Sequence, residues 1–184
     1  MAELHPLLGG VAARWWVSGG IALDLHLGRT TRAHGDLDVS VARPDWPAAA
    51  VALGRHLQLC PVADGWIDEA GELTAAEVDS LWCRREPGAP WCLQVLLEEV
   101  EDDDWVYRRD PRVRLPLSRA TWTHDGLRCV DPAVQLLWKS AAPRPEDDAD
   151  RRLVEPSLTP GQRTWLAGAI DLAHPGSPWA GLSR

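Results

Sequence analysis

Two aspartates two positions apart, Asp36 and Asp38, are the residues of this chain best suited to chemistry. They lie in an alternating segment that predicts a strand. Side chains of a strand switch faces at every residue, so both carboxylates share one face with Ser40, while Leu37 and Val39 share the other. Two neighbouring carboxylates repel each other unless a cation lies between them. Mg²⁺ is the natural candidate, because it takes oxygen ligands from one or two carboxylates and from substrate phosphates.

A Gly-Gly pair stands ahead of these aspartates, where a strand over residues 15–18 is expected to give way to a helix over 21–27 that ends at Gly28. Glycine permits the tight turn, and free backbone N–H groups at a helix start bind phosphate. Gly19 and Gly20 are therefore predicted to meet a phosphate group. The phosphate and the metal would come together between this turn and the acidic face.

The Ser-Gly-Gly turn at 18–20, followed by the Asp-x-Asp pair, resembles the signature of the polymerase-β-type nucleotidyltransferase superfamily. The fuller segments GGIALDLHLGR and TRAHGDLDV are similar to its aminoglycoside and lincosamide nucleotidyltransferase branch. In that branch an Arg-x-His pair, here Arg32 and His34, precedes the aspartates. The resemblance runs from about residue 7 to residue 179. It implies an α/β nucleotidyltransferase fold, with a mixed twisted sheet flanked by helices, and a role in antibiotic resistance.

By the same resemblance, Asp36 and Asp38 are catalytic metal ligands for Mg²⁺, and a third carboxylate should come from the predicted strand over 91–97. The chain carries Gln94 at that place. Glutamine offers a neutral carbonyl oxygen but cannot accept a proton, so the usual general base is missing. Glu98 would share the face of Gln94, about 13 Å further along the strand.

The acidic residues from 98 to 104 are interpreted mainly as a solvated turn that attracts a cationic substrate. The alternative left open is that Glu98 or one of its neighbours replaces the missing base, which requires the strand to end early.

The resemblance also assigns positions that would bind the nucleotide: Ser18, Gly19, Gly20, Arg32, His34 and Lys139. Simpler roles remain open for three of them: surface charge for Arg32, a structural hydrogen bond for His34, and an exposed helix position for Lys139. Asp147 and Asp150 match family positions in a stretch where Glu146 replaces a lysine.

The rest of the chain divides into a β-rich part and a helical part. A helix is predicted over residues 46–56 with Asp45 as its N-cap, and strands are predicted over 57–62, 80–85 and 105–109. Asp125-Gly126 predicts a tight hairpin. From Asp131 onward, capped helices prevail, the last of them opened by a capping box at Thr159. We therefore expect a nucleotidyltransferase-like α/β domain over 1–130 and a small C-terminal helical subdomain over 131–184.

Charge and hydropathy limit the possible partners. The net charge of −8 argues against nucleic acid, which is bound by basic patches, and favours a cationic small-molecule ligand. No apolar run is long enough to span a bilayer, so no membrane partner is expected. The N-terminus does not have the pattern of a signal peptide, and the protein is expected to be cytoplasmic. The sequence leaves the oligomeric state open.

Three functions compete on these grounds. The first is Mg²⁺-dependent transfer of a nucleoside monophosphate from an NTP to a hydroxyl of a small cationic acceptor, such as an aminoglycoside. The second is a small-molecule binding protein that keeps the fold without catalysis, which Gln94 and the eleven Trp residues favour. The third is a tailoring enzyme of natural-product metabolism that uses the cleft without a nucleotide.

Overall fold

The computed structural model describes residues 7–69, 73 and 77–181 of the chain, and its elements fall into an α/β part and a helical part. The elements of the α/β part are β1 (Trp15–Ser18), α2 (Gly19–Leu27), β2 (Leu37–Ala42), η1 (Arg43–Asp45), α3 (Trp46–Leu53), β3 (Gln58–Ala63), β4 (Trp66–Ile67), β5 (Ser80–Arg84), β6 (Leu93–Glu101), β7 (Asp104–Val106), β8 (Arg114–Pro116), α4 (Leu117–Ala120), β9 (Thr121–His124) and β10 (Leu127–Val130). The helical part consists of α5 (Pro132–Ser140), α6 (Pro145–Val154), η2 (Glu155–Ser157) and α7 (Pro160–Ala173). The division at residue 130 stays a prediction about domains.

The described strands join in one mixed sheet of ten strands, in the order β4-β3-β5-β6-β2-β1-β10-β9, with β7 paired to β6 and β8 paired to β7. β2 lies inside the sheet, antiparallel to β1 and parallel to β6. Its register places Asp38 beside Ser18 on one side and beside Gln94 on the other. Ser18, Asp38 and Gln94, which are far apart in the chain, thus lie side by side on three neighbouring strands. The predicted mixed α/β sheet is confirmed.

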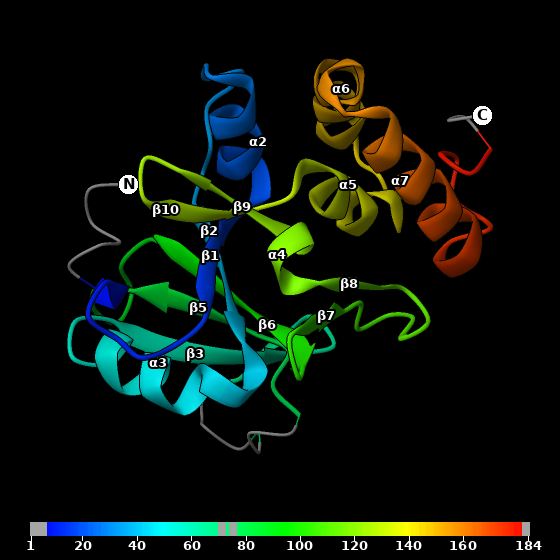
Figure 1. Ribbon diagram of the computed structural model, residues 1–184. Coiled ribbons are helices and arrows are strands. Elements are labelled where there is room, and N and C mark those ends of the chain that lie inside the picture. Colours follow the sequence, from blue (N-terminus) through cyan, green and yellow to red (C-terminus); the bar gives the residue numbers. More distant parts are fainter. Residues whose placement is uncertain (1–6, 70–72, 74–76, 182–184) are drawn as a thin grey trace.

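The apolar face of β2 forms the middle of the core, where Val39 and Val41 are fully buried together with Val95 of β6. Burial of such side chains contributes about 1.5–3 kcal/mol each. Figure 1 shows α3 along the lower side of the sheet and α5, α6 and α7 grouped at the upper right. A cavity lined from both β6 and α5 lies between the sheet and these C-terminal helices.

The local signals of the second half are confirmed. The side chain of Asp131 caps α5, and Thr159 and Gln162 form a reciprocal capping box at the start of α7. Between β9 and β10, Asp125 and Gly126 both have positive φ, of 47° and 80°, as a tight hairpin turn requires. Short-range chemistry was sufficient to place these features.

The prediction for α3 was wrong in two respects. The helix ends at Leu53 and not at residue 56. Asp45 makes no side-chain cap. Its carboxylate instead accepts hydrogen bonds from the backbone N–H and the Nε of Arg14, at 2.9 and 2.7 Å. A long-range ion pair has replaced the local cap.

The strands around the acidic segment also differ from the prediction. β6 continues to Glu101, so the turn is confined to the residues between β6 and β7. β7 ends at Val106 and does not reach residue 109, because the next residue, Tyr107, donates its backbone N–H to Val113 across a loop. None of the described helices has the length and apolar character that a bilayer crossing requires.

Candidate functional site

The two aspartates lie at the start of β2, on the side of the sheet that faces the C-terminal helices. Asp38 is a residue of β2, and Asp36 directly precedes this strand. Burial, and then the charge of Asp36, raise the pKa of Asp38 to about 6, although Lys139 and His34 act in the opposite direction. Burial and Asp36 thus make the charged form of Asp38 costly, and a bound cation would offset this cost. The pair therefore fits a divalent ion chemically.

Gln94 occupies the place where a third carboxylate was expected. It is paired with Asp38 in the parallel register of β2 and β6, so the two side chains leave neighbouring strands on the same face. Among the described residues, no group of three or more His, Cys, Asp or Glu side chains is placed to hold a metal ion. The site offers Mg²⁺ two charged ligands and one neutral amide oxygen, and phosphate oxygens would have to complete the shell.

The Gly-Gly turn is packed directly against the acidic pair. α2 begins at Gly19 and not at residue 21, and Gly19 has a φ of +69°. A Cβ on Gly19 would lie 2.7 Å from Cγ of Asp38, and one on Gly20 would lie 2.6 Å from Nδ1 of His34. Position 19 thus requires glycine, and a side chain at position 20 would displace His34 and Arg32. The N–H of Gly19, however, donates to Oε1 of Gln135 at 2.7 Å, so it is already satisfied within the protein.

Ser18 is placed differently from the other residues of the turn. It is buried, its Oγ lies 2.7 Å from Oγ of Ser40, and it is not among the residues that line the cavity. The Ser18 hydroxyl holds β1 to β2 and does not line the cavity, and its nucleotide contact stays a prediction.

Arg32 and His34 both line the cavity and both have partners. His34 Nε2 lies 2.7 Å from Oδ2 of Asp24, which is the structural hydrogen bond left open by the sequence. Arg32 Nε lies 3.4 Å from Oδ1 of Asp150, on α6. The ion pair is loose, so the guanidinium remains available to an anion in the cavity.

Lys139 lies in a nearly closed ion-pair network. Its Nζ is 2.5 Å from Oδ1 of Asp147 and 3.1 Å from Oδ2 of Asp150, and its side chain is 9% exposed. Burial raises the pKa of Asp147, but hydrogen bonds from Arg144 and Lys139 outweigh burial and lower this pKa to about 2. The single lysine of the chain is thus neither an exposed helix residue nor free of partners. These ion pairs hold the Lys139 side chain in place where it lines the cavity.

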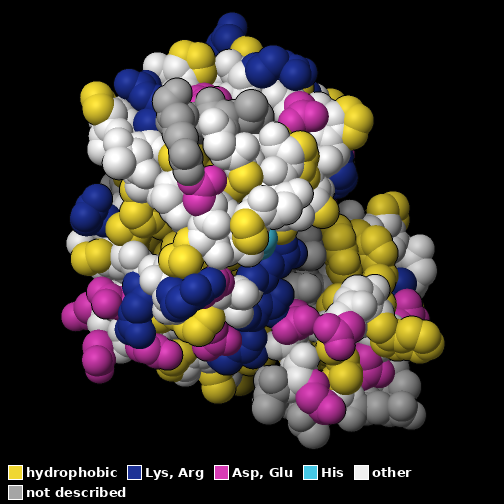
Figure 2. Space-filling view, turned by 90° about the vertical axis from the view of Figure 1, so that its right-hand side faces the viewer, with side chains coloured by type: hydrophobic (Ala, Val, Ile, Leu, Met, Phe, Trp, Pro, Cys, Tyr) yellow, Lys and Arg dark blue, Asp and Glu magenta, His cyan; other side chains and the backbone are white. Residues whose placement is uncertain are grey.

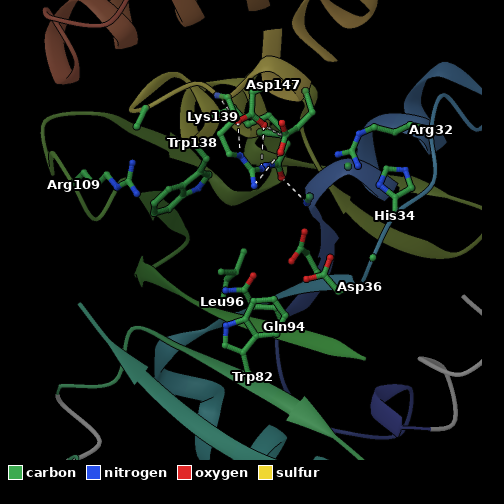
Figure 3. Close-up of a pocket in the computed structure, with 18 residues that line it drawn as sticks. Arg32, His34, Asp36, Trp82, Gln94, Leu96, Arg109, Trp138, Lys139 and Asp147 are labelled. Atoms are coloured by element: carbon green, nitrogen blue, oxygen red, sulfur yellow. Dashed lines mark hydrogen bonds and ion pairs between the residues drawn. The ribbon is translucent and has the colours of Figure 1, made fainter. Parts of the chain in front are cut away.

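The cavity has a volume of about 570 Å³. In the view of Figure 3, Lys139 and Asp147 lie above it, Arg32 and His34 to the right, Asp36 in the middle, Trp82, Gln94 and Leu96 below, and Arg109 and Trp138 to the left. Several lining residues were missing from the predicted site, among them Trp82, Arg109, Gln135, Trp138 and Arg144. The Trp-rich composition was the only signal that pointed toward any of them.

Glu98 lies in a buried polar chain and not in a solvated turn. It is 3% exposed, Oε2 accepts from Trp105 Nε1 at 2.8 Å, and Oε1 accepts from Ser40 Oγ at 3.2 Å. It pairs with Ala42, four residues beyond Asp38 on β2. The idea that Glu98 replaces the missing base required an early end of the strand, and β6 does not end there. Burial raises the pKa of Glu98 to about 7.

Glu98 should make the fold less stable as the pH rises. Its folded pKa of about 7 lies above its ordinary value of 4.5, so its stabilising proton is lost from the folded state as the pH rises through this interval. Glu98→Gln keeps the acceptor for Trp105 but cannot titrate. The free energy of unfolding of this variant should therefore lack the fall with rising pH, up to about 3 kcal/mol, that is expected for the wild type. Urea unfolding of both proteins between pH 4.5 and 7.5 measures it. Parallel stability curves would mean that Glu98 is not protonated in the fold.

Comparison with known proteins agrees with this geometry. Residues 1–57 match the family model described as aminoglycoside-2''-adenylyltransferase. A crystal structure of ANT(2'')-Ia in complex with adenylyl-2''-tobramycin superimposes with a TM-score of 0.64 at 15% identity, covering 93% of this chain and 97% of that one. A solution structure of ANT(2'')-Ia gives 0.59 at 18% identity, with 93% and 90% covered. Lincomycin-bound LnuA, a lincosamide antibiotic adenylyltransferase, gives 0.56 at 14% identity, with 84% and 91% covered.

The fold is therefore that of the superimposed structures, a nucleotidyltransferase fold. The family model and the superimposed structures confirm the resemblance to the aminoglycoside and lincosamide branch. No curated protein matches the chain in a sequence search. At these identities the superpositions establish the fold, and the reaction has to be argued from the site itself.

Proposed function

We propose that the chain is a Mg²⁺-dependent nucleotidyltransferase that moves a nucleoside monophosphate from an NTP to a hydroxyl of a small acceptor. One observation carries this proposal: the Gly-Gly turn is packed so closely against Asp38 that a Cβ on Gly19 has no room. Such packing brings a helix start, which favours phosphate, next to a carboxylate pair, which favours a cation. Bound Mg²⁺ would neutralise the phosphate charge at this place.

The residues of the cavity divide the remaining tasks. Arg32, Arg144 and Lys139 line the cavity. Arg32, the most loosely paired of them, would neutralise phosphate charge, while Arg144 and Lys139 stay paired with Asp147. Gln94 cannot take the proton of the acceptor hydroxyl. Asp38 is the carboxylate beside Gln94, and as a ligand of the metal it would act only as a weak general base. We therefore expect a slow enzyme.

The ligands of two superimposed structures support the kind of acceptor. One ANT(2'')-Ia structure contains adenylyl-2''-tobramycin, and the LnuA structure contains lincomycin. Small hydroxylated compounds of antibiotic size are accordingly the first acceptors to try, with ATP as the first donor.

A second candidate function is a small-molecule binding protein without transferase activity. It is favoured by Gln94, which stands where the base would be, and by Trp82 and Trp138, whose rings line the same cavity. A cavity of this kind can hold a ligand by stacking without reacting with it.

Calorimetric titration with Mg·ATP tests the first proposal. The wild type is expected to bind Mg·ATP, and Asp38→Asn should weaken binding at least about tenfold, because it removes one of two charged metal ligands. Asp125→Asn is the matched control: the same chemical change falls on an exposed hairpin turn, where asparagine is equally suitable. Failure of the wild type to bind Mg·ATP would overturn the transferase and leave the binding protein.

A further inference from the structure

The geometry of in-line transfer divides the cavity into two sides. The attacking oxygen and the leaving pyrophosphate lie roughly in line on opposite sides of the α-phosphorus. In Figure 3, Arg32 and Lys139 are on the upper and right side, where pyrophosphate would leave. The acceptor would then approach from the lower and left side, along Trp82, Leu96 and Trp138. This assignment rests on the proposed transferase function.

The carboxylates of the cavity are already engaged. Asp147 binds Lys139 and Arg144, and Glu146 lies 3.2 Å from Arg144 Nη1. The remaining pair, Asp36 and Asp38, would be neutralised by the metal. A polycationic acceptor needs carboxylates of its own, because an ammonium group taken out of water without a partner is costly. The described lining has none left to offer it.

The acceptor side instead presents rings and unused donors. The guanidinium carbon of Arg109 lies 5.3 Å from the ring centroid of Trp138, and Arg109 forms no ion pair with any described residue. Nε1 of Trp138 is the one buried side-chain polar atom in the described part of the chain that lacks a hydrogen-bond partner. Both groups donate: the indole N–H has no acceptor, and Arg109, which interacts with the Tyr107 hydroxyl, carries further N–H donors. An anionic group of a ligand would satisfy both.

The surface near the cavity also carries positively charged side chains. Figure 2 shows Lys and Arg side chains gathered across the middle of the face that contains the loop between β7 and β8. The net charge of −8 describes the whole chain and does not describe this face. Arg108, Arg112 and Arg114 of this segment pair with carboxylates. Arg109 is the exposed arginine of the segment that lines the cavity.

We propose that the acceptor is a flat, largely apolar compound that carries a hydroxyl and an anionic group, and not a polycation. Its rings lie along Trp82, Leu96 and Trp138, and its anionic group binds Arg109. The hydroxyl oxygen forms a bond to the α-phosphorus and the α–β phosphoanhydride bond breaks. Pyrophosphate leaves, and the hydroxyl proton passes to Asp38.

Binding of two probes tests this preference. 6-Hydroxy-2-naphthoate and tobramycin are titrated into the protein alone and into its complex with Mg²⁺ and α,β-methylene-ATP, a donor that cannot be cleaved at the α–β bond. The naphthoate is expected to bind at least about tenfold more tightly than tobramycin in both cases. Weaker binding of the naphthoate than of tobramycin overturns the inference. If the nucleotide analogue does not bind, only the proposed transferase function is overturned. The titration without nucleotide still measures which of the two probes the cavity binds more tightly.

Charge reversal at Arg109 adds a second readout. Arg109 is exposed, so Arg109→Glu should fold, weaken naphthoate binding at least about tenfold and improve tobramycin binding. Arg55→Glu makes the same charge change at an exposed position outside the cavity lining and should leave both affinities unchanged. Trp138→Phe keeps a ring but removes the unpaired N–H, and should weaken the naphthoate while sparing 2-naphthol. Equal effects of Arg109→Glu and Arg55→Glu would contradict the assignment of the anionic group to Arg109.

Discussion

Gln94→Asp is expected to raise the rate of nucleotidyl transfer by about 10²- to 10⁴-fold, which is the usual contribution of a general base. The substitution places a carboxylate beside Asp38 in the register of β2 and β6, where the amide now stands. It restores both the proton acceptor and the third negative charge for the metals. Pyrophosphate release with Mg²⁺, ATP and an acceptor panel measures the change.

Gln94→Asn is the matched control, because asparagine has the size of aspartate but neither its charge nor its basicity. A gain in both variants would have to come from the shorter side chain and would contradict the explanation. No gain in Gln94→Asp, with Mg·ATP binding intact, would favour the binding protein over the impaired enzyme.

The same substitution should also change stability in a metal-dependent way. A third carboxylate beside Asp36 and Asp38 adds like-charge repulsion, and Asp38 already has a pKa raised to about 6 by burial and by Asp36. Without Mg²⁺ the Tm of Gln94→Asp should therefore fall below that of the wild type, and Mg²⁺ should recover it. This melting experiment needs no knowledge of the acceptor.

The parts of the site that the sequence predicted are those formed by neighbours along the chain. The turn at Gly19 and the alternation at Asp36 and Asp38 are local patterns, and their meeting follows from adjacent strands. The contacts that decide whether these groups are free to bind a ligand are made with residues far away in the sequence. Gln135 caps the N–H of Gly19 across 116 positions, and Asp150 pairs with Arg32 across 118. No periodicity in the chain encodes such partners.

Glu98 shows a different limit of sequence reasoning. Charged residues in succession usually mark solvent, and the run from Glu98 to Asp104 fits that pattern. The structure continues β6 to Glu101, into this run, because β7 pairs with it, and Glu98 turns toward the indole of Trp105. One buried hydrogen-bond donor thus decided the environment of the carboxyl, and composition carried no information about it.

Gly19→Ala is expected to abolish Mg·ATP binding and to destabilise the fold by about 2–5 kcal/mol. Two costs add: about 1–2 kcal/mol for a side chain at a φ of +69°, and about 1–3 kcal/mol for overpacking. The added Cβ would lie 2.7 Å from Cγ and 2.8 Å from Cβ of Asp38, so this carboxylate must move. Urea unfolding and calorimetry with Mg·ATP measure the two effects.

Gly28→Ala separates the clash from the backbone strain. Gly28 ends the same helix with nearly the same φ, +66°, but an added Cβ there meets nothing within 4 Å. It should cost only about 1–2 kcal/mol and leave Mg·ATP binding intact. If both variants lost the same stability and both still bound Mg·ATP, the close contact of Gly19 with Asp38 would not be what builds the site. A loss of Mg·ATP binding in Gly19→Ala alone would show that binding depends on the close packing of the turn against Asp38.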